Sequence, residues 1–227
     1  MKKKENNLIS LIRYPDLASL GNLLLGFLGV IFLLRNNEVA FLKSILFAGL
    51  LDGLDGLIAR RRYQDSSSSF GVEIDSLADL VSFGFAPALF FWVKTDLNIF
   101  YLVIPMAFLA VALLRLARYN ITKEKSGFIG VPTTCTGLIL IILLSFNIQN
   151  YNLIMGISSL VLTSLMISPF HFPKFRTKFL VPIGLLLVFL ISSQGNLFYI
   201  GKIILLALLL AYILISPVIE WNSPKVS

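Results

Sequence analysis

Residues 39–60 read VAFLKSILFAGLLDGLDGLIAR, and only a few polar side chains interrupt this apolar run. A helix needs roughly 20 mainly apolar residues to cross about 30 Å of hydrocarbon, so the run predicts a transmembrane helix. Seven further runs meet the same requirement, and the full set is about 15–34, 39–60, 73–93, 98–119, 131–147, 151–168, 179–193 and 197–217. The runs are continuous rather than alternating with period two, which favours helices over membrane-spanning strands. We therefore expect an all-α fold, a polytopic membrane bundle of about eight transmembrane helices.

The composition excludes an ordinary soluble domain. Of the 227 residues, 57% are hydrophobic and 14% are charged, and the mean hydropathy is +0.86. Soluble domains carry roughly 25% charged residues. The net charge of +7 does not indicate a nucleic-acid partner, because phosphate-reading surfaces need dense Lys and Arg on a soluble scaffold. The expected partner is the lipid bilayer.

The positions of the cations predict an orientation. With both termini in the cytoplasm, the outer ends of the helices carry only Arg35, Lys43, Lys94 and Lys202, whereas the other fifteen Lys and Arg residues lie on the inner side. This bias follows the positive-inside rule, so we expect both termini and the active site to face the cytoplasm from the cell membrane. Residues 1–14 form a basic segment that we expect to lie on the anionic inner leaflet.

Four aspartates interrupt two of the apolar runs. Asp52 and Asp55 lie three residues apart on one predicted helix, and Asp75 and Asp79 lie four apart on the next. Each spacing puts both acids on one helix face, and each acid costs about 2.5–3.5 kcal/mol near the bilayer centre. If the two faces meet, the four carboxylates repel one another unless a hard cation lies among them. Oxygen ligands of this kind favour Mg²⁺ or Mn²⁺.

These residues resemble the signature of the CDP-alcohol phosphotransferase family, D-x₂-D-G-x₂-A-R-x(n)-G-x₃-D-x₃-D. The eight fixed positions are Asp52, Asp55, Gly56, Ala59, Arg60, Gly71, Asp75 and Asp79. The resemblance implies transfer of a substituted phosphate from a CDP-linked lipid to an alcohol, with release of CMP. It implies two divalent ions as the cofactor. It also implies a homodimer and a six-helix membrane core over residues 15–170, which leaves 171–227 as a two-helix extension.

By the same resemblance, Asp52, Asp55 and Asp75 hold metal, and Asp79 is the catalytic base and a further metal ligand. Sequence alone does not separate these roles, because coupled carboxylates titrate as a group. The residues expected to contact the CDP-lipid are Asn22, Gly56, Ala59, Arg60, Ser69 and Gly71. Residues 66–69 have two possible interpretations at this point: a polar loop that closes over the cytidine, or a simple linker.

Within the family, three stretches resemble phosphatidylserine synthases. They are residues 75–87, 114–120 and 130–132, whereas Pro169 stands where that group would have a basic residue. The expected acceptor is L-serine, bound by Arg115, Arg118 and Asn120, because an Arg fork matches a carboxylate. Glycerol 3-phosphate and inositol phosphate are alternative acceptors, and an ion or metal transporter is an alternative of another class. Both a diacylglycerol and an archaeal ether-lipid donor fit the sequence.

Overall fold

The computed structural model describes residues 11–62, 69–122, 127–146, 151–173 and 177–221, without the side chains of 55–62, 69, 151, 177–180 and 216–221. Its helices are α2 (Tyr14–Leu34), α3 (Glu38–Arg62), α4 (Ser69–Asp79), α5 (Ala86–Lys94), α6 (Val103–Thr122), α7 (Thr133–Leu144), α8 (Tyr151–Ile167), α9 (Thr177–Ser192) and α10 (Gly195–Trp221). A π-helical segment, η1 (Leu80–Phe85), joins α4 to α5, and a 3-10 turn, η2 (Ile99–Tyr101), precedes α6. Because α4, η1 and α5 follow one another without a break, they form one continuous helix, and the described residues contain eight such helices from α2 to α10. The prediction of an all-α fold is therefore confirmed.

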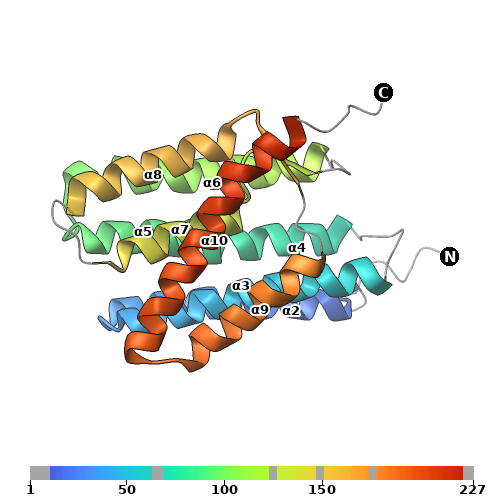
Figure 1. Cartoon of the computed structure of the whole chain (residues 1–227), viewed down its shortest axis with the longest axis horizontal. Coiled ribbons are helices and arrows are strands. Elements are labelled where there is room, and N and C mark those ends of the chain that lie inside the picture. Colours follow the sequence, from blue (N-terminus) through green and yellow to red (C-terminus); the bar gives the residue numbers. More distant parts are fainter. Residues whose placement is uncertain (1–10, 63–68, 123–126, 147–150, 174–176, 222–227) are drawn as a thin grey trace.

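The helices form a layered bundle (Figure 1). α2, α3 and α9 lie along one side, α6 and α8 along the other, and α4, α5 and α7 lie between them. α10 crosses the bundle obliquely and packs on α7 and on α9. The first turn of α2 and the last turn of α10 lie at the same end of the bundle, as an even number of crossings requires.

Four helical stretches are long and apolar enough to cross a membrane. They are Tyr14–Leu34, Phe70–Lys94, Ile99–Thr122 and Gly195–Ile215. Their exposed side chains are largely apolar, for example Leu24 and Phe27 on α2, which suits contact with lipid. An integral membrane protein is therefore confirmed, whereas the choice of membrane and its orientation stay predictions.

α7 differs from the predicted span 131–147. It covers only Thr133–Leu144, and at 1.5 Å per residue its 12 residues reach about 18 Å. Nearly every side chain of α7 is buried, including Cys135. A helix that is apolar on all sides is suited to the centre of a bundle. α7 is thus the central helix of the bundle, enclosed by its neighbours.

The π-helical segment was not predicted. In it, the backbone N–H of Ala86 donates to the carbonyl of Val81, five residues earlier. Pro87 follows directly, and its ring would collide with the carbonyl of Phe83 in a regular α-helix. The wider π turn accommodates the proline while keeping the helix continuous. Asp79 immediately precedes this segment, so the irregularity borders the predicted catalytic residue.

A two-stranded antiparallel sheet was also not predicted. β1 (Gly127–Ile129) pairs with β2 (His171–Pro173), with Phe128 opposite Phe172. Beyond β1, Gly130 has a φ of +75°, and its N–H donates to the carbonyl of Phe170 at 2.8 Å. A Cβ at this position would collide with the backbone of Met166, so only glycine fits. The sheet joins the segment before α7 to the segment before α9.

Candidate active site

Asp52, Asp75 and Asp79 converge between α3 and α4. One carboxylate oxygen from each residue lies within 4.8 Å of the other two. Asp79 is buried, with 7% of its surface exposed, and the other two are half-buried. The predicted meeting of the two acidic helix faces is confirmed for these three residues. Asp55 lies one turn after Asp52 on α3, but its side chain is outside the described residues.

Two neighbouring side chains position Asp79. The Asn22 amide on α2 donates to one carboxylate oxygen at 3.0 Å. The Thr134 hydroxyl on α7 lies 3.5 Å from the other oxygen and 3.3 Å from a carboxylate oxygen of Asp52. Since a hydroxyl carries one proton, Thr134 donates to one of the two acids at a time. Sequence reasoning missed Thr134, although a threonine pair at the start of an apolar run was a visible signal.

α2 approaches the acids through a polar face. Asp16, Ser19 and Asn22 are all buried on it. The Ser82 hydroxyl of the π-helical segment donates to the backbone carbonyl of Asn22 at 2.9 Å. One turn later on α2, Gly26 lies so close to Ser82 that a Cβ would collide with it. This close contact fixes Asn22 beside Asp79.

The other residues expected to contact the CDP-lipid are less completely described. Gly71 lies one turn before Asp75 on α4 and is half-buried. Gly56, Ala59 and Arg60 belong to the last turns of α3 and Ser69 begins α4, but the surroundings of these four lie outside the described residues. Their binding roles stay predictions, as do those of Asn22 and Gly71.

The three residues expected to bind serine have different surroundings. Arg115 is 6% exposed, and its guanidinium lies over the rings of Phe128 and Tyr119, 5.3 and 5.7 Å from their centroids. Its Nε is buried and has no hydrogen-bond partner among the described residues, while Asp79 attracts its charge. Arg115 is therefore a buried cation beside the acids with donor capacity to spare.

Arg118 and Asn120 make contacts within the protein. One guanidinium nitrogen of Arg118 donates to the carbonyl of Ile129 at 2.5 Å and lies 3.3 Å from that of Met166. The Asn120 side chain accepts from the Ser76 hydroxyl and donates to Glu73. The cavity beside Arg115 and Arg118 measures about 10 Å³, room for about one water. The hydrogen bonds of Arg118 to the carbonyls of Ile129 and Met166 hold the β1 segment in place.

A larger pocket of about 210 Å³ opens beside Asp52 and Thr134. Its other lining residues are mainly apolar and come from α3, α7 and the two C-terminal helices, including Ile183, Leu187 and Leu209. Phe128, which stacks on Arg115, also lines it. The predicted two-helix extension thus contributes one wall of a pocket that reaches the acids.

The donor set fits a divalent ion. Three carboxylates within 4.8 Å repel one another unless a cation or protons lie among them. Within the described part of the chain, the cluster contains no histidine or cysteine, and oxygen ligands suit Mg²⁺ or Mn²⁺. The arrangement is an acidic cluster able to hold a divalent ion, in reach of a partly apolar pocket.

Comparison with known proteins gives consistent matches. Residues 12–166 match the CDP-alcohol phosphatidyltransferase family. The chain is similar to the CDP-diacylglycerol–serine O-phosphatidyltransferase of Helicobacter pylori, with 28% identity over 220 residues that cover 92% of this chain and 90% of that protein. The protein of the same name from Methanocaldococcus jannaschii is 35% identical over 172 residues, which cover 75% of this chain and 79% of that one. An archaetidylserine synthase of Methanothermobacter thermautotrophicus is 32% identical over 130 residues, 56% of each chain.

Proposed function

Because the chain belongs to the CDP-alcohol phosphatidyltransferase family, we propose that it transfers the phosphatidyl group of a CDP-linked lipid to the hydroxyl of L-serine. The serine oxygen forms a bond to the lipid-bearing phosphorus, the bond from that phosphorus to the CMP oxygen breaks, and CMP leaves. The products are CMP and a phosphatidylserine-type lipid. The observation that carries the proposal is the convergence of Asp52, Asp75 and Asp79 beside a buried arginine. The names of the similar proteins support serine as the acceptor.

Asp79 is the proposed general base. A serine hydroxyl is a weak nucleophile at neutral pH and needs a base within hydrogen-bond reach. Asn22 donates to the Asp79 carboxylate, and the Thr134 hydroxyl lies within hydrogen-bond reach of its other oxygen, which helps to fix its orientation. The proton of the serine hydroxyl passes to a carboxylate oxygen of Asp79 as the new bond to phosphorus forms.

We assign the divalent ions to Asp52, Asp55, Asp75 and Asp79. When bound, Mg²⁺ or Mn²⁺ neutralises the charge that develops on the pyrophosphate oxygens as the bridging bond breaks. Arg60 would donate to the phosphates, while Gly56, Ala59 and Gly71 let the nucleotide approach the helix backbones. Asn22 and Ser69 complete the proposed donor site.

Arg115 is the centre of the proposed acceptor site. Its buried Nε has an unused donor, and a guanidinium beside Asp79 can bind the serine carboxylate while the hydroxyl reaches the base. Arg118 and Asn120 are the other proposed contacts. Because Arg118 also donates to Ile129, part of its contribution is to shape the site.

The wider arrangement follows from the same proposal. The active site faces the cytoplasm of the cell membrane, both termini lie on that side, and the protein is a homodimer. We assign the catalytic core to residues 15–170, and Ile183, Leu187 and Leu209 of the extension 171–227 close the pocket beside Asp52. Residues 1–10 lie outside the described residues, so the position of the segment 1–14 on the inner leaflet stays a prediction.

CMP release by the purified protein tests the proposal. The assay supplies CDP-diacylglycerol or its ether-lipid counterpart with Mg²⁺ or Mn²⁺, and offers L-serine, glycerol 3-phosphate and inositol phosphate in turn. Serine-dependent CMP release that is abolished by a chelator is the expected result. Release that prefers glycerol 3-phosphate or inositol phosphate would replace the acceptor, and ion flux without CMP release would favour a transporter.

A further inference from the structure

Three helices bring a group of charged side chains together far from the three aspartates. Lys43 and Glu38 belong to α3, Lys94 ends α5, and Lys202 lies on α10 beside Ser145, which follows α7. Glu38 precedes Asp52 by fourteen residues on α3, and Lys94 follows Asp79 by fifteen, so each helix separates the two groups by roughly 20 Å. The charged group therefore occupies the opposite end of the bundle.

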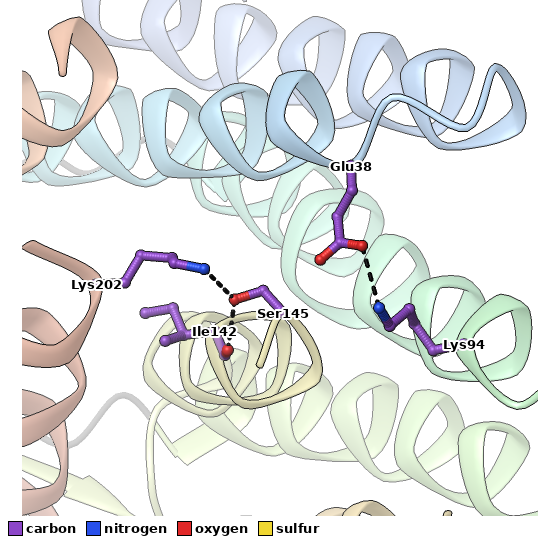
Figure 2. A network of polar contacts seen from close by, with 5 residues as sticks. All are labelled: Glu38, Lys94, Ile142, Ser145 and Lys202. Carbon is purple, nitrogen blue, oxygen red and sulfur yellow. Dashed lines mark hydrogen bonds and ion pairs between the residues drawn. The ribbon is translucent and has the colours of Figure 1, made fainter. Parts of the chain in front are cut away.

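Lys202 is buried without an acidic partner among the described residues. Its side chain is 7% exposed, and its ammonium donates to the Ser145 hydroxyl at 2.8 Å (Figure 2). That hydroxyl in turn donates to the carbonyl of Ile142 at 2.7 Å. The centroids of three aromatic rings lie 4.8 to 5.6 Å from the same ammonium nitrogen, and they belong to Phe146, Phe198 and Tyr199. Neutral oxygens and rings solvate this cation, and Glu38 attracts its charge only from a longer distance, without an ion pair.

Lys43 adds a second cation to the same place. Its ammonium donates to the carbonyl of Ser193 at 2.7 Å and lies 5.5 Å from the centroid of the Phe198 ring. Lys202 lies at the same distance from that ring, so the two ammonium groups are separated by at most twice this distance. The nearby carboxylate of Glu38 already pairs with Lys94 at 3.1 Å (Figure 2). Within this group of described residues, three lysines thus share one carboxylate.

A pocket of about 470 Å³ lies between these groups. Its size falls within the roughly 300–1,000 Å³ of small-molecule sites. Lys43, Lys202, Gln194 and Ser145 supply donors, whereas Leu42 and Tyr199 supply apolar lining. The carboxylate of Glu38 also lines the pocket, where it pairs with Lys94. Beside it on α10, the side chains of Leu197 and Ile200 are more than half exposed and apolar. The pocket thus combines a net positive charge with exposed apolar side chains along which hydrocarbon can lie.

The three lysines also belong to the few cations that the predicted topology places on the outer side. Of the four cations predicted at the outer ends, three are the lysines of this group, and Arg35 is the fourth. Cations on that side oppose the positive-inside rule. A bound anion would neutralise part of the positive charge of these outer lysines, including that of the buried Lys202.

We propose that this pocket binds the phosphate of an anionic phospholipid in the leaflet opposite the active site. The phosphate accepts hydrogen bonds from Lys43 and Lys202, and the acyl chains lie along the exposed apolar side chains of α10. The site is separate from the serine transfer reaction, because the aspartates lie at the other end of the same helices.

The test measures lipid binding by the full-length protein in an uncharged detergent, using native mass spectrometry. The probe is dioctanoyl phosphatidylglycerol, and dioctanoyl phosphatidylcholine is the zwitterionic control. Lys202→Met and Lys43→Gln should each weaken phosphatidylglycerol binding at least tenfold, since each removes a charge-assisted contact. Arg35→Gln is the matched control, because it removes an exposed outer cation that does not line the pocket.

A third variant and a competing ligand distinguish a lipid site from a site for a free anion. Lys202→Arg keeps the charge and should keep most of the affinity, and Lys43→Gln carries the test if Lys202→Met fails to fold. Inorganic phosphate that displaces phosphatidylglycerol at equal concentration would assign the pocket to a free anion and overturn the lipid proposal. Equal binding of both lipids would overturn the proposal that this pocket binds an anionic lipid. Equal losses of affinity in Arg35→Gln and Lys202→Met would overturn it as well.

Discussion

Replacing Thr134 with valine tests whether the hydroxyl on α7 positions the carboxylates of Asp52 and Asp79. Valine keeps the shape of the side chain and removes only the donor. The distances of 3.3 and 3.5 Å are long for an O–H donor, and only one of the two bonds can form at a time. The free energy lost with the Thr134 hydrogen bond should therefore be about 1.5 kcal/mol, the lower end of the range for hydrogen bonds to charged groups. That energy corresponds to roughly a tenfold fall in kcat/KM for the CDP-lipid.

The assay is CMP release at saturating serine with CDP-lipid and Mg²⁺ varied in turn. The half-saturating Mg²⁺ concentration should rise, because Asp52 also loses its donor, and the KM for serine should stay unchanged. Thr133→Val is the control: its hydroxyl is the neighbouring one on α7, and it is buried but has no hydrogen-bond partner among the described residues. The reasoning is refuted if the two variants behave alike, or if Thr134→Val changes only the KM for serine.

Four other substitutions test the same site and fold. Asp79→Asn should lower kcat by about 10² or more while CDP-lipid binding persists in a nucleotide titration, since an amide cannot accept the proton. Arg115→Ala should raise the KM for serine roughly ten- to a hundredfold in saturation kinetics, and an unchanged KM would place the acceptor elsewhere. Gly130→Ala should destabilise the protein by about 1–3 kcal/mol, seen as a lower Tm in detergent, because it combines a positive φ with a backbone collision. Single cysteines at 120–128 on a Cys135→Ser background should react with an impermeant thiol reagent only from the cytoplasmic side, and labelling from outside would reverse the orientation.

The helices were predictable because long apolar runs leave few other structures in a membrane. The predicted starts and ends of α2 and α3 lie within two residues of those observed. α7 was predicted too long, because the predicted span 131–147 included Pro132, which precedes the helix, and the polar Ser145 and Asn147, which follow its end at Leu144. The strands β1 and β2 are three residues each, too short to leave a periodic pattern, and they pair across more than forty residues.

The acids of the site were predictable from spacing, but their supporting contacts were not. Asp52, Asp75 and Asp79 meet because i, i+4 spacing fixes a helix face. Thr134 reaches them from another helix, and such a contact depends on tertiary packing that one sequence does not contain. The hydrogen bonds of Arg118 to backbone carbonyls are of the same kind. Its charge was visible in the sequence, but its partners were not.

The central position of α7 has a consequence for how the protein is made in the cell. A helix of about 18 Å is too short to cross the bilayer alone, and its polar Thr134 must face the aspartates rather than lipid. α10, which packs on α7 and lines the pocket beside Asp52, is synthesised after both. A growing chain that has not yet reached α10 therefore lacks one wall of this pocket, although Asp52 and Thr134 are already part of the chain. Completion of the pocket is tied to the insertion of α10.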